Sequence, residues 1–270
     1  MSAERPDVSV VMGVWQTPPA YLRAAVQSVL AQTHRSFELI IVEDPSSQSA
    51  AEVLEEFSDP RIRHLRRPAR SGLTTALRDG MAMARAPLIA RLDSDDVCLP
   101  QRLAVQVRYL QDHPDVAVVG TRISIVDDQN RVIGRRLLPL THDEIASALR
   151  RYNCISHPSV LFRKAAVEAV GGYDSAARIE DYDLWCRMVV AGYRFANLAD
   201  DLVQYRFHLQ SLRSTNVHNV IRETIAVKKK YFDGRFTWRD RIRLAMEQAL
   251  LLLPVRAVLW LFRKSQYKSA

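Results

Sequence analysis

The stretch PLIARLDSDDVCLPQRLAVQ, residues 87–106, decides the fold of this chain. Its first six residues are a short, mainly apolar run, which predicts a buried strand. Carboxylates follow at once in the cluster DSDD, residues 93–96, and Pro100 then stands in the first turn of a helix expected to reach about residue 111. A strand that ends in acids and leads directly into a helix is typical of a parallel sheet covered by helices.

The sequence on the amino-terminal side repeats this alternation. Apolar, β-branched runs predict strands at 8–14, 37–43 and 61–66, and segments with helical spacing lie at 21–32, 50–57 and 73–85. Strand and helix alternate with short connections throughout. The pattern predicts an α/β fold with a doubly wound, Rossmann-like, mainly parallel sheet flanked by helices.

The carboxyl ends of these predicted strands carry polar chemistry. The first strand ends in the turn 13–16, the second in Glu43 and Asp44, and the fourth in the cluster 93–96. Ligands of an open α/β sheet bind beyond the carboxyl ends of its strands. One acid at a strand end is often only the cap of the next helix. Several acids that converge on one edge indicate a site for a hard cation and a nucleotide.

The second half of the chain is less regular. Strand-like runs at 116–126 and 132–137 flank the turn-rich DDQN and predict a hairpin. An extended run at 159–163 and helices at 142–152, from 164 to the Gly171–Gly172 pair, and at 180–191 are also expected. The last helix begins with Glu180 and Asp181. Acids there have a structural explanation, because negative charge is favourable at a helix N-terminus.

The net charge of +8 is concentrated in the last fifth of the chain. Between residues 221 and 270 basic residues outnumber acidic ones by twelve to four, whereas residues 1–220 are balanced. The same region contains an apolar run at 249–262 that is too short to cross a bilayer as a helix. Basic flanks beside an apolar, Trp-containing segment are typical of a helix that lies in an anionic membrane interface. A C-terminal helix packed on the domain is the alternative, and the neutral body disfavours a nucleic-acid partner.

Composition sets the broad class of protein. Of the 270 residues 48% are hydrophobic and 25% charged, which is ordinary for a globular protein with a substantial core. The first residues lack the apolar core of a secretory signal. Cys98, Cys154 and Cys186 are scattered without metal-ligand spacing, which suits free thiols in a reducing compartment. We therefore expect a cytoplasmic protein.

Six ordered blocks of sequence resemble the family-2 glycosyltransferases, the inverting, nucleotide-sugar-dependent enzymes of GT-A fold. The resemblance extends over about residues 7–210. The ordered set of blocks is far more specific evidence for the family than any single block. The blocks are VSVVMGVWQ (8–16), LIIVED (39–44), GLTTALRDG (72–80), IARLDSDDVCLPQRLAVQ (89–106), HPSVLFRKAAVEAVGGYD (157–174), and IEDYDLWCRMVVAGY (179–193) with LVQYRFH (202–208).

The resemblance implies roles for the residues of the donor side. Asp44 would hydrogen-bond the nucleotide base, and the backbone around Gly13 and Trp15 would shape the wall for base and ribose. Asp95 would ligate a divalent metal, Mn²⁺ or Mg²⁺, that bridges the donor diphosphate, with Asp93 near the ribose or the metal. Within the same motif Ser94 belongs to the nucleotide-sugar site.

On the acceptor side the resemblance makes Asp181 the general base, with Glu180 beside it. Trp185, one helical turn further on, would form a hydrophobic platform for the acceptor sugar. Asp96 would support the acid cluster next to the acceptor. His157 would contact the diphosphate or the acceptor, or be an ordinary loop histidine.

Departures from the family pattern affect the donor contacts more than the reaction. Gly13 and Gln16 replace the usual proline and asparagine, and Pro45 follows Asp44. Arg78 stands near a frequent asparagine, and it would either pair with the diphosphate or face solvent. Arg206 or His208 in the last block would reach the diphosphate or pack structurally.

The predicted reaction is a single displacement at the anomeric carbon. A metal neutralises the leaving nucleoside diphosphate, and a carboxylate takes the proton of the acceptor hydroxyl. The predicted organisation is a glycosyltransferase domain at 1–215, with a nucleotide-sugar half at about 1–112 and an acceptor half at about 113–215. A helical region at 216–270 follows, which either associates with a membrane or packs on the domain.

The expected activity is sugar transfer to a glycan or lipid-linked glycan in cell-surface polysaccharide synthesis, by an enzyme peripheral on the inner face of the cell membrane. A sugar-nucleotide pyrophosphorylase is an alternative, but it would need a Gly-rich, basic phosphate loop after the first strand, and GVWQTPPAYLR is not one. The other alternative is a catalytically inactive family member that acts as a membrane-bound assembly factor. The four acids Asp44, Asp93, Asp95 and Asp181 argue against it.

Overall fold

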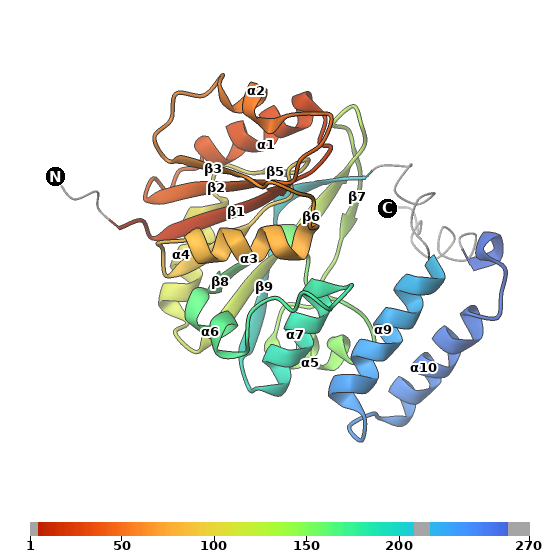
Figure 1. Cartoon of the computed structure of the whole chain (residues 1–270). Coiled ribbons are helices and arrows are strands. Elements are labelled where there is room, and N and C mark those ends of the chain that lie inside the picture. Colours follow the sequence, from red (N-terminus) through yellow and green to blue (C-terminus); the bar gives the residue numbers. More distant parts are fainter. Residues whose placement is uncertain (1–4, 208–216, 259–270) are drawn as a thin grey trace.

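One mixed sheet with helices on both faces forms the body of the protein (Figure 1). The computed structural model describes residues 5–207 and 217–258. Within these residues nine strands make the sheet: β1 (Val8–Val14), β2 (Phe37–Glu43), β3 (Ile62–Arg66), β4 (Leu88–Arg91), β5 (Val97–Cys98), β6 (Val116–Val126), β7 (Val132–Arg136), β8 (Leu161–Arg163) and β9 (Arg194–Arg206).

The helices alternate with the strands in the first half and are more irregularly placed in the second. They are α1 (Pro19–Leu30), α2 (Ala50–Leu54), α3 (Leu73–Met83), α4 (Arg102–Asp112), α5 (His142–Leu149), the 3₁₀ turn η1 (His157–Ser159), α6 (Lys164–Ala169), α7 (Glu180–Val190), α9 (Val217–Phe232) and α10 (Trp238–Leu250).

The strand order is β3-β2-β1-β4-β8-β6-β9-β5, with β7 paired to β6 as a hairpin. Strands β3, β2, β1 and β4 are parallel to one another, β8 is antiparallel to both of its neighbours, and β6 and β9 are parallel. The predicted α/β fold with a mainly parallel sheet is therefore confirmed. The expected hairpin around residues 127–130 is confirmed as well.

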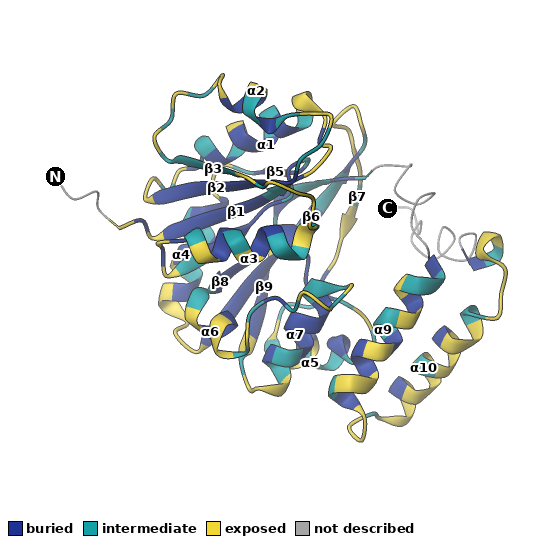
Figure 2. Ribbon diagram, viewed as in Figure 1, coloured by how far each residue is buried: buried dark blue, intermediate teal, exposed yellow. Residues whose placement is uncertain are grey.

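Both faces of the sheet are covered, so the central strands are apolar without alternation. All seven residues of β2 are buried, as expected for a parallel strand with helices on both sides. Successive side chains point to opposite faces. On β1, Val10 and Met12 pack with α1, α2 and α4, whereas Val11 packs with α3, α5 and α7. Figure 2 shows this dark-blue sheet between helices whose outer sides are yellow.

Helix α3 lies so close to the sheet that it needs a glycine. A Cβ added to Gly80 would come within 2.4 Å of the Val11 Cγ1 atom. Because a branched side chain in the middle of β1 cannot withdraw from a packed interior, this contact fixes how closely α3 approaches the carboxyl end of β1.

A buried arginine fastens α4 behind the acid cluster. The Arg102 guanidinium donates to the carbonyl oxygens of Arg91 at 2.8 Å and Val160 at 3.1 Å, and its Nε donates to Gln106 at 3.0 Å. These bonds join α4 to the ends of β4 and to the segment before β8. The loop 93–96 is thus held between two fixed elements.

Helices α9 and α10 form an antiparallel pair that is attached to the body through α7 and α5. Lys230 and Tyr231 of α9 donate to Asp183 of α7 at 3.0 and 2.8 Å. At the start of α10, Asp240 is buried and its carboxylate lies 3.3 Å from the Arg150 guanidinium. The expected helical C-terminal region is therefore present in residues 217–250.

Two sequence expectations reach beyond the described residues. The predicted domain boundary near residue 215 falls in the segment 208–216, and residues 259–262 of the predicted apolar run fall in the segment 259–270. Neither segment is among the described residues. The boundary stays a prediction. Across residues 5–207 and 217–258, no helix combines the length and the hydropathy that a membrane span requires.

Candidate active site

The ends of β1, β2 and β4 meet at one edge of the sheet. The parallel register pairs Val14 with Glu43 and Val11 with Arg91, so the residues that follow each strand are neighbours. A hydrogen bond of 2.6 Å between the hydroxyl groups of Thr17 and Ser94 ties the first turn to the acid loop. The convergence of these segments, expected from the sequence, is present in the structure.

The first turn presents an aromatic ring to solvent. Trp15 is 40% exposed, and the Arg70 guanidinium covers one face of its ring at 3.6 Å from the centroid. Gln16 has φ 52°, a left-handed conformation that is unusual for a residue other than glycine. A Cβ at Gly13 would lie 2.9 Å from Leu73 Cδ1, so a larger residue at position 13 would require the Leu73 side chain to shift.

Asp44 holds the entry to α3. Its carboxylate accepts hydrogen bonds from the backbone N–H groups of Ser71 at 3.1 Å and Gly72 at 2.7 Å, and Arg67 lies 3.3 Å from it. Only 4% of the side chain is exposed. A hydrogen bond that a nucleotide base donates to Asp44 stays a prediction, and it would compete with these internal bonds.

The acid loop after β4 contains both accessible and buried carboxylates. Asp93 and Asp95 are partly exposed, whereas Asp96 is buried and accepts a hydrogen bond from the backbone N–H of Arg206 at 2.8 Å. Burial, together with the charges of Asp93 and Asp95, raises the pKa of Asp96 well above its ordinary value. Asp96 is therefore a supporting residue of the cluster, and its expected contact with an acceptor is wrong because its side chain does not reach the surface.

Arg91 is a buried cation beneath this loop that the sequence did not single out. Its guanidinium forms an ion pair with Asp93, and its Nε and Nη1 atoms lack hydrogen-bond partners among the described residues. Burial opposes its charge, but the Asp93 carboxylate outweighs that effect and raises the pKa of Arg91. A charged residue two positions before Asp93, inside an apolar strand, was the available sequence signal.

Arg206 at the end of β9 closes the cluster from the other side. It donates to the carbonyl oxygens of Asp95 and Asp127, both at 3.0 Å, and to Asn130 Oδ1 at 2.7 Å. Its guanidinium also lies 4.1 Å from the centroid of the Tyr21 ring. The structural alternative for Arg206 is therefore confirmed, and His208 lies outside the described residues.

Glu180 and Asp181 form the acidic first turn of α7. Burial, then the charge of Asp181 and more weakly that of Asp93, raises the pKa of Glu180 to about 7. Asp181 accepts from the side-chain amide of Asn153 and from the backbone N–H of Tyr182, both at 2.7 Å. Burial also raises the pKa of Asp181, although these two bonds oppose the rise. Asn153, in the loop after α5, has no sequence signature.

The expected platform at Trp185 is wrong. Its side chain is fully buried and meets Phe162 and Phe195 edge-on, with ring centroids 6.4 and 6.0 Å apart. Trp185 lies one helical turn along α7 from Asp181, and its side chain packs into the core cluster on the sheet. It therefore offers no face to a sugar.

His157 is also part of the core. It is buried against Trp185, and its Nε2 atom shares a hydrogen bond of 2.8 Å with the Tyr173 hydroxyl. Burial, and to a smaller degree the charge of Arg91, holds the pKa of His157 well below its ordinary value. The expected contact with diphosphate or acceptor is wrong because the ring nitrogen points at a core tyrosine.

Arg78 lies on the exposed side of α3, as in the solvent-facing alternative.

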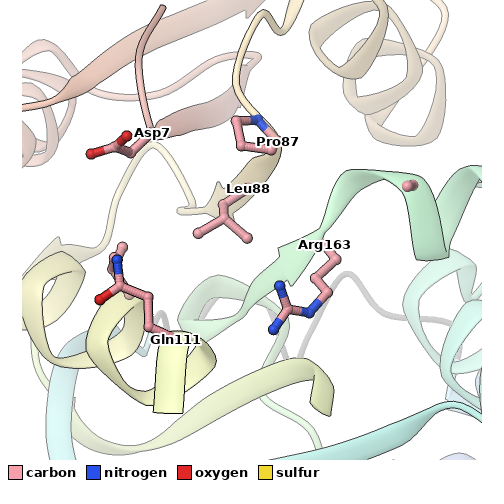
Figure 3. Close-up of a pocket in the computed structure, with 7 residues that line it drawn as sticks. Asp7, Pro87, Leu88, Gln111 and Arg163 are labelled. Atoms are coloured by element: carbon pink, nitrogen blue, oxygen red, sulfur yellow. The ribbon is translucent and has the colours of Figure 1, made fainter. Parts of the chain in front are cut away.

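A separate pocket lies at the opposite edge of the sheet. It has a volume of about 380 Å³ and is lined by residues that include Asp7, Leu88 and Arg163 (Figure 3). Leu88 begins β4, whereas the acid loop follows the end of that strand. Arg163 donates to the carbonyl oxygens of Leu110 and Val116 and so joins strand and helix ends. This pocket is therefore not part of the acidic site.

The sequence as a whole matches known glycosyltransferases. Residues 9–171 match the family model described as glycosyl transferase family 2. The chain is 28% identical to the amylovoran biosynthesis glycosyltransferase AmsE of Erwinia amylovora, over 92% of this chain and 94% of that protein. It is 32% identical to the O-antigen biosynthesis glycosyltransferase WbnJ of Escherichia coli, over 77% of this chain and 82% of that protein. The chain belongs to glycosyl transferase family 2.

The solved structures agree on the fold. The S. aureus TarS fragment 1-349, crystallised in complex with UDP, superposes with a TM-score of 0.64 at 15% identity, over 90% of this chain and 70% of that one. The expected GT-A type of α/β fold is confirmed by this match and by the family. The protein is a glycosyltransferase, and the competing pyrophosphorylase is set aside.

Proposed function

We propose that this glycosyltransferase moves one sugar, with inversion, from a nucleoside-diphosphate sugar to a hydroxyl group of a glycan acceptor during cell-surface polysaccharide synthesis. The observation that carries the proposal is the convergence of the ends of β1, β2 and β4 on one edge of the sheet, where the first turn is bonded to the acid loop, in a chain of glycosyl transferase family 2. We assign the proton acceptor to the acids Glu180 and Asp181 at the start of α7.

Asp181 is the proposed general base. Each of its carboxylate oxygens accepts one hydrogen bond from the protein, which fixes the side chain and leaves further lone pairs available. The proton of the acceptor hydroxyl passes to this carboxylate while the acceptor oxygen bonds to the anomeric carbon. The bond between that carbon and the diphosphate oxygen breaks on the opposite face, so the configuration inverts. Burial raises the pKa of Asp181, which favours proton uptake.

The residues of the acid loop fit a divalent cation. Asp95 and Asp93 are partly exposed carboxylates, the hard ligands that Mn²⁺ and Mg²⁺ prefer. In the described part of the chain no group of three or more His, Cys, Asp or Glu residues surrounds a metal position, so these two acids would hold the ion together with donor oxygens and water. When bound, the ion offsets the negative charge that develops on the leaving diphosphate. The Arg91 ion pair holds Asp93 in place beside Asp95.

A uridine nucleotide is the proposed donor class. The TarS structure that shares this fold was crystallised with UDP. In this chain the donor wall would be formed by the backbone around Gly13 and by the half-exposed ring of Trp15. The Arg70 guanidinium, which lies over that ring, would add a positive charge to the donor wall.

The proposed acceptor is a lipid-linked glycan at the inner face of the cell membrane. AmsE and WbnJ are named for amylovoran and O-antigen synthesis, and both names concern cell-surface polysaccharides. The basic, apolar C-terminal region of this chain suits an enzyme that works peripherally at an anionic membrane. A cytoplasmic location follows from the same proposal, because nucleotide sugars and the inner leaflet meet there.

The stereochemistry of transfer tests this proposal. The full-length protein would be incubated with radiolabelled UDP-glucose, UDP-galactose or UDP-N-acetylglucosamine, Mn²⁺, and a lipid extract containing polyprenyl-diphosphate-linked sugars. Labelled product would be isolated and its new linkage read by NMR. We expect a β linkage from these α-linked donors. An α linkage would overturn the inverting mechanism. The same incubation would be repeated with deoxythymidine and guanosine nucleotide sugars, and the absence of product with every donor would favour the inactive assembly factor.

A further inference from the structure

We infer that the outward face of α10 binds the surface of an anionic lipid bilayer. We call this surface the α10 outer face; it consists of Trp238, Ile242 and Met246 with the flanking cations Arg239 and Arg241. The inference rests on the membrane partner of the proposed function and assigns that partner to one surface of the protein.

The acidic residues of α10 are turned inward. Glu247 accepts two hydrogen bonds from the buried Lys228 ammonium group of α9, at 2.7 and 2.5 Å. Asp240 caps the start of α10 and pairs with Arg150. These two are the only acids between residues 235 and 258. Because both are buried in internal ion pairs, the outward side of α10 carries no negative charge.

The opposite side of the helix is apolar along its centre. Trp238 is 66% exposed, Ile242 51% and Met246 56%. Spaced four residues apart, they form one stripe along successive turns, and the exposed Ala245 and Ala249 widen it. A helix that only faces water carries polar residues there. Figure 2 shows α10 on the outside of the pair, with its buried patches toward α9.

Cations border this stripe on both sides. At 100° per residue, Arg239 falls on one flank and Arg241 on the other, and both are exposed. Arg243 lies on the same side as Arg239, where it pairs with Glu247 at 3.1 Å. The stripe continues past the helix end in the exposed Leu252, Leu253 and Val255. An apolar centre between cationic flanks matches an interfacial helix that buries its apolar side chains among acyl chains and places its cations at lipid phosphates.

Charge also argues for lipid over a second copy of this chain. A symmetric dimer through the α10 outer face would bring the same surface against itself. Arginines such as Arg239 and Arg241 would then face their own copies, with no acid on either face to pair with them. An anionic bilayer supplies both the negative charge and the apolar medium.

The position of this face links membrane binding to the active site. Asp183, which accepts hydrogen bonds from Lys230 and Tyr231 of α9, stands two residues after Asp181. Those bonds and the Lys228–Glu247 ion pair join the α10 outer face to the helix that begins with the proposed base. Docking of α10 on a bilayer would therefore hold the acceptor side of the site at a fixed position relative to the lipid surface.

Sedimentation with vesicles tests the inference on the full-length protein. The probes are vesicles of phosphatidylcholine with 30% phosphatidylglycerol, compared with pure phosphatidylcholine. The test variants are the double substitution Ile242→Ser with Met246→Ser, and Arg239→Glu. Their matched controls are Val220→Ser, an exposed apolar residue of α9, and Arg108→Glu, an exposed cation of α4. Circular dichroism and thermal unfolding establish that each variant is folded.

We expect wild type to bind the anionic vesicles at least tenfold more tightly than the neutral ones, and the two test variants to weaken that binding at least tenfold. The controls should stay within twofold of wild type. Equal binding to both vesicle types, or test variants that bind like wild type, would overturn the inference. So would a dimer, seen by analytical ultracentrifugation, that Ile242→Ser with Met246→Ser dissociates while vesicle binding is absent.

Failure of the proposed function is distinguishable from failure of this inference. Calorimetric titration of each variant with UDP and Mn²⁺ reports the donor site without lipid. Loss of UDP binding with intact vesicle binding would count against the donor site alone, and the reverse result against the α10 outer face alone.

Discussion

The substitution Glu180→Gln tests whether the start of α7 holds a carboxylate whose ionisation the folded protein opposes. Burial, then the charges of Asp181 and Asp93, raises the pKa of Glu180 from 4.5 to about 7. In the unfolded chain the same carboxyl loses its proton near its ordinary pKa. The folded state therefore binds this proton more tightly than the unfolded state does, and the protein loses stability as the pH rises from 4.5 to 7.

The magnitude of this loss of stability follows from the displacement of the Glu180 pKa. Near pH 4 the carboxyl group is largely protonated in both states, so glutamine has little electrostatic effect there. Above pH 7 the full penalty is present, and at about 1.4 kcal/mol per tenfold change it amounts to at most about 3.5 kcal/mol. Glu180 is only partly buried, so solvent screens some of this energy. We expect glutamine to be more stabilising at pH 8 than at pH 4 by about 1–2 kcal/mol.

Urea denaturation of wild type and Glu180→Gln at pH 4 and pH 8 measures this difference in the free energy of unfolding. The matched control is Glu55→Gln on the exposed surface, where we expect changes below about 0.5 kcal/mol at both pH values. A Glu180→Gln protein that gains no stability relative to wild type between pH 4 and pH 8 would refute the electrostatic account of this site.

Two further predictions concern the base and the packing of α3. Asp181→Asn should lower kcat by about 10²–10⁴ through loss of the general base, while the altered contact with Asn153 costs about 1 kcal/mol of stability; a variant that keeps more than a tenth of wild-type transfer would contradict the assignment. Gly80→Ala should destabilise the protein by about 1–3 kcal/mol in urea because its Cβ meets Val11. Gly134→Ala, whose Cβ has room, is the control, and equal midpoints for the two alanine variants would count against this packing.

The parallel half of the fold could be predicted because its signals are local. The run 37–43 has four consecutive apolar residues, 39–42, at its centre, and the structure places β2 at 37–43. The acids after β2 and β4 could be brought to one edge from topology alone, since the carboxyl ends of parallel strands lie together. Nothing beyond strand order was required for that step.

The errors arose where a role depends on depth below the surface. Trp185 shares a helix face with Asp181 in sequence spacing, yet its side chain is fully buried in the core. His157 precedes a proline in what reads as a loop, and it is buried beneath that loop against Tyr173. Helical periodicity reports direction around an axis and not distance along it from the site.

Some residues of the site were missed because their partners are remote in sequence. Asn153 contacts Asp181 across 28 positions, and Asp44 organises a turn 27 and 28 positions away. Arg91 was visible as a charge in an apolar strand, but its pairing with Asp93 depends on side-chain direction at the strand end. Such contacts follow from tertiary packing, which no spacing rule encodes.

The central claim is a metal-dependent nucleotide-sugar site at the acid loop. The most direct test is calorimetric titration of UDP, dTDP and GDP and their sugars, with and without Mn²⁺, into wild type and Asp95→Ala. The account predicts that one nucleotide series binds, that Mn²⁺ strengthens its binding, and that Asp95→Ala weakens it at least tenfold. Binding that is the same without Mn²⁺ and unchanged in Asp95→Ala, or no binding of any series, would contradict it.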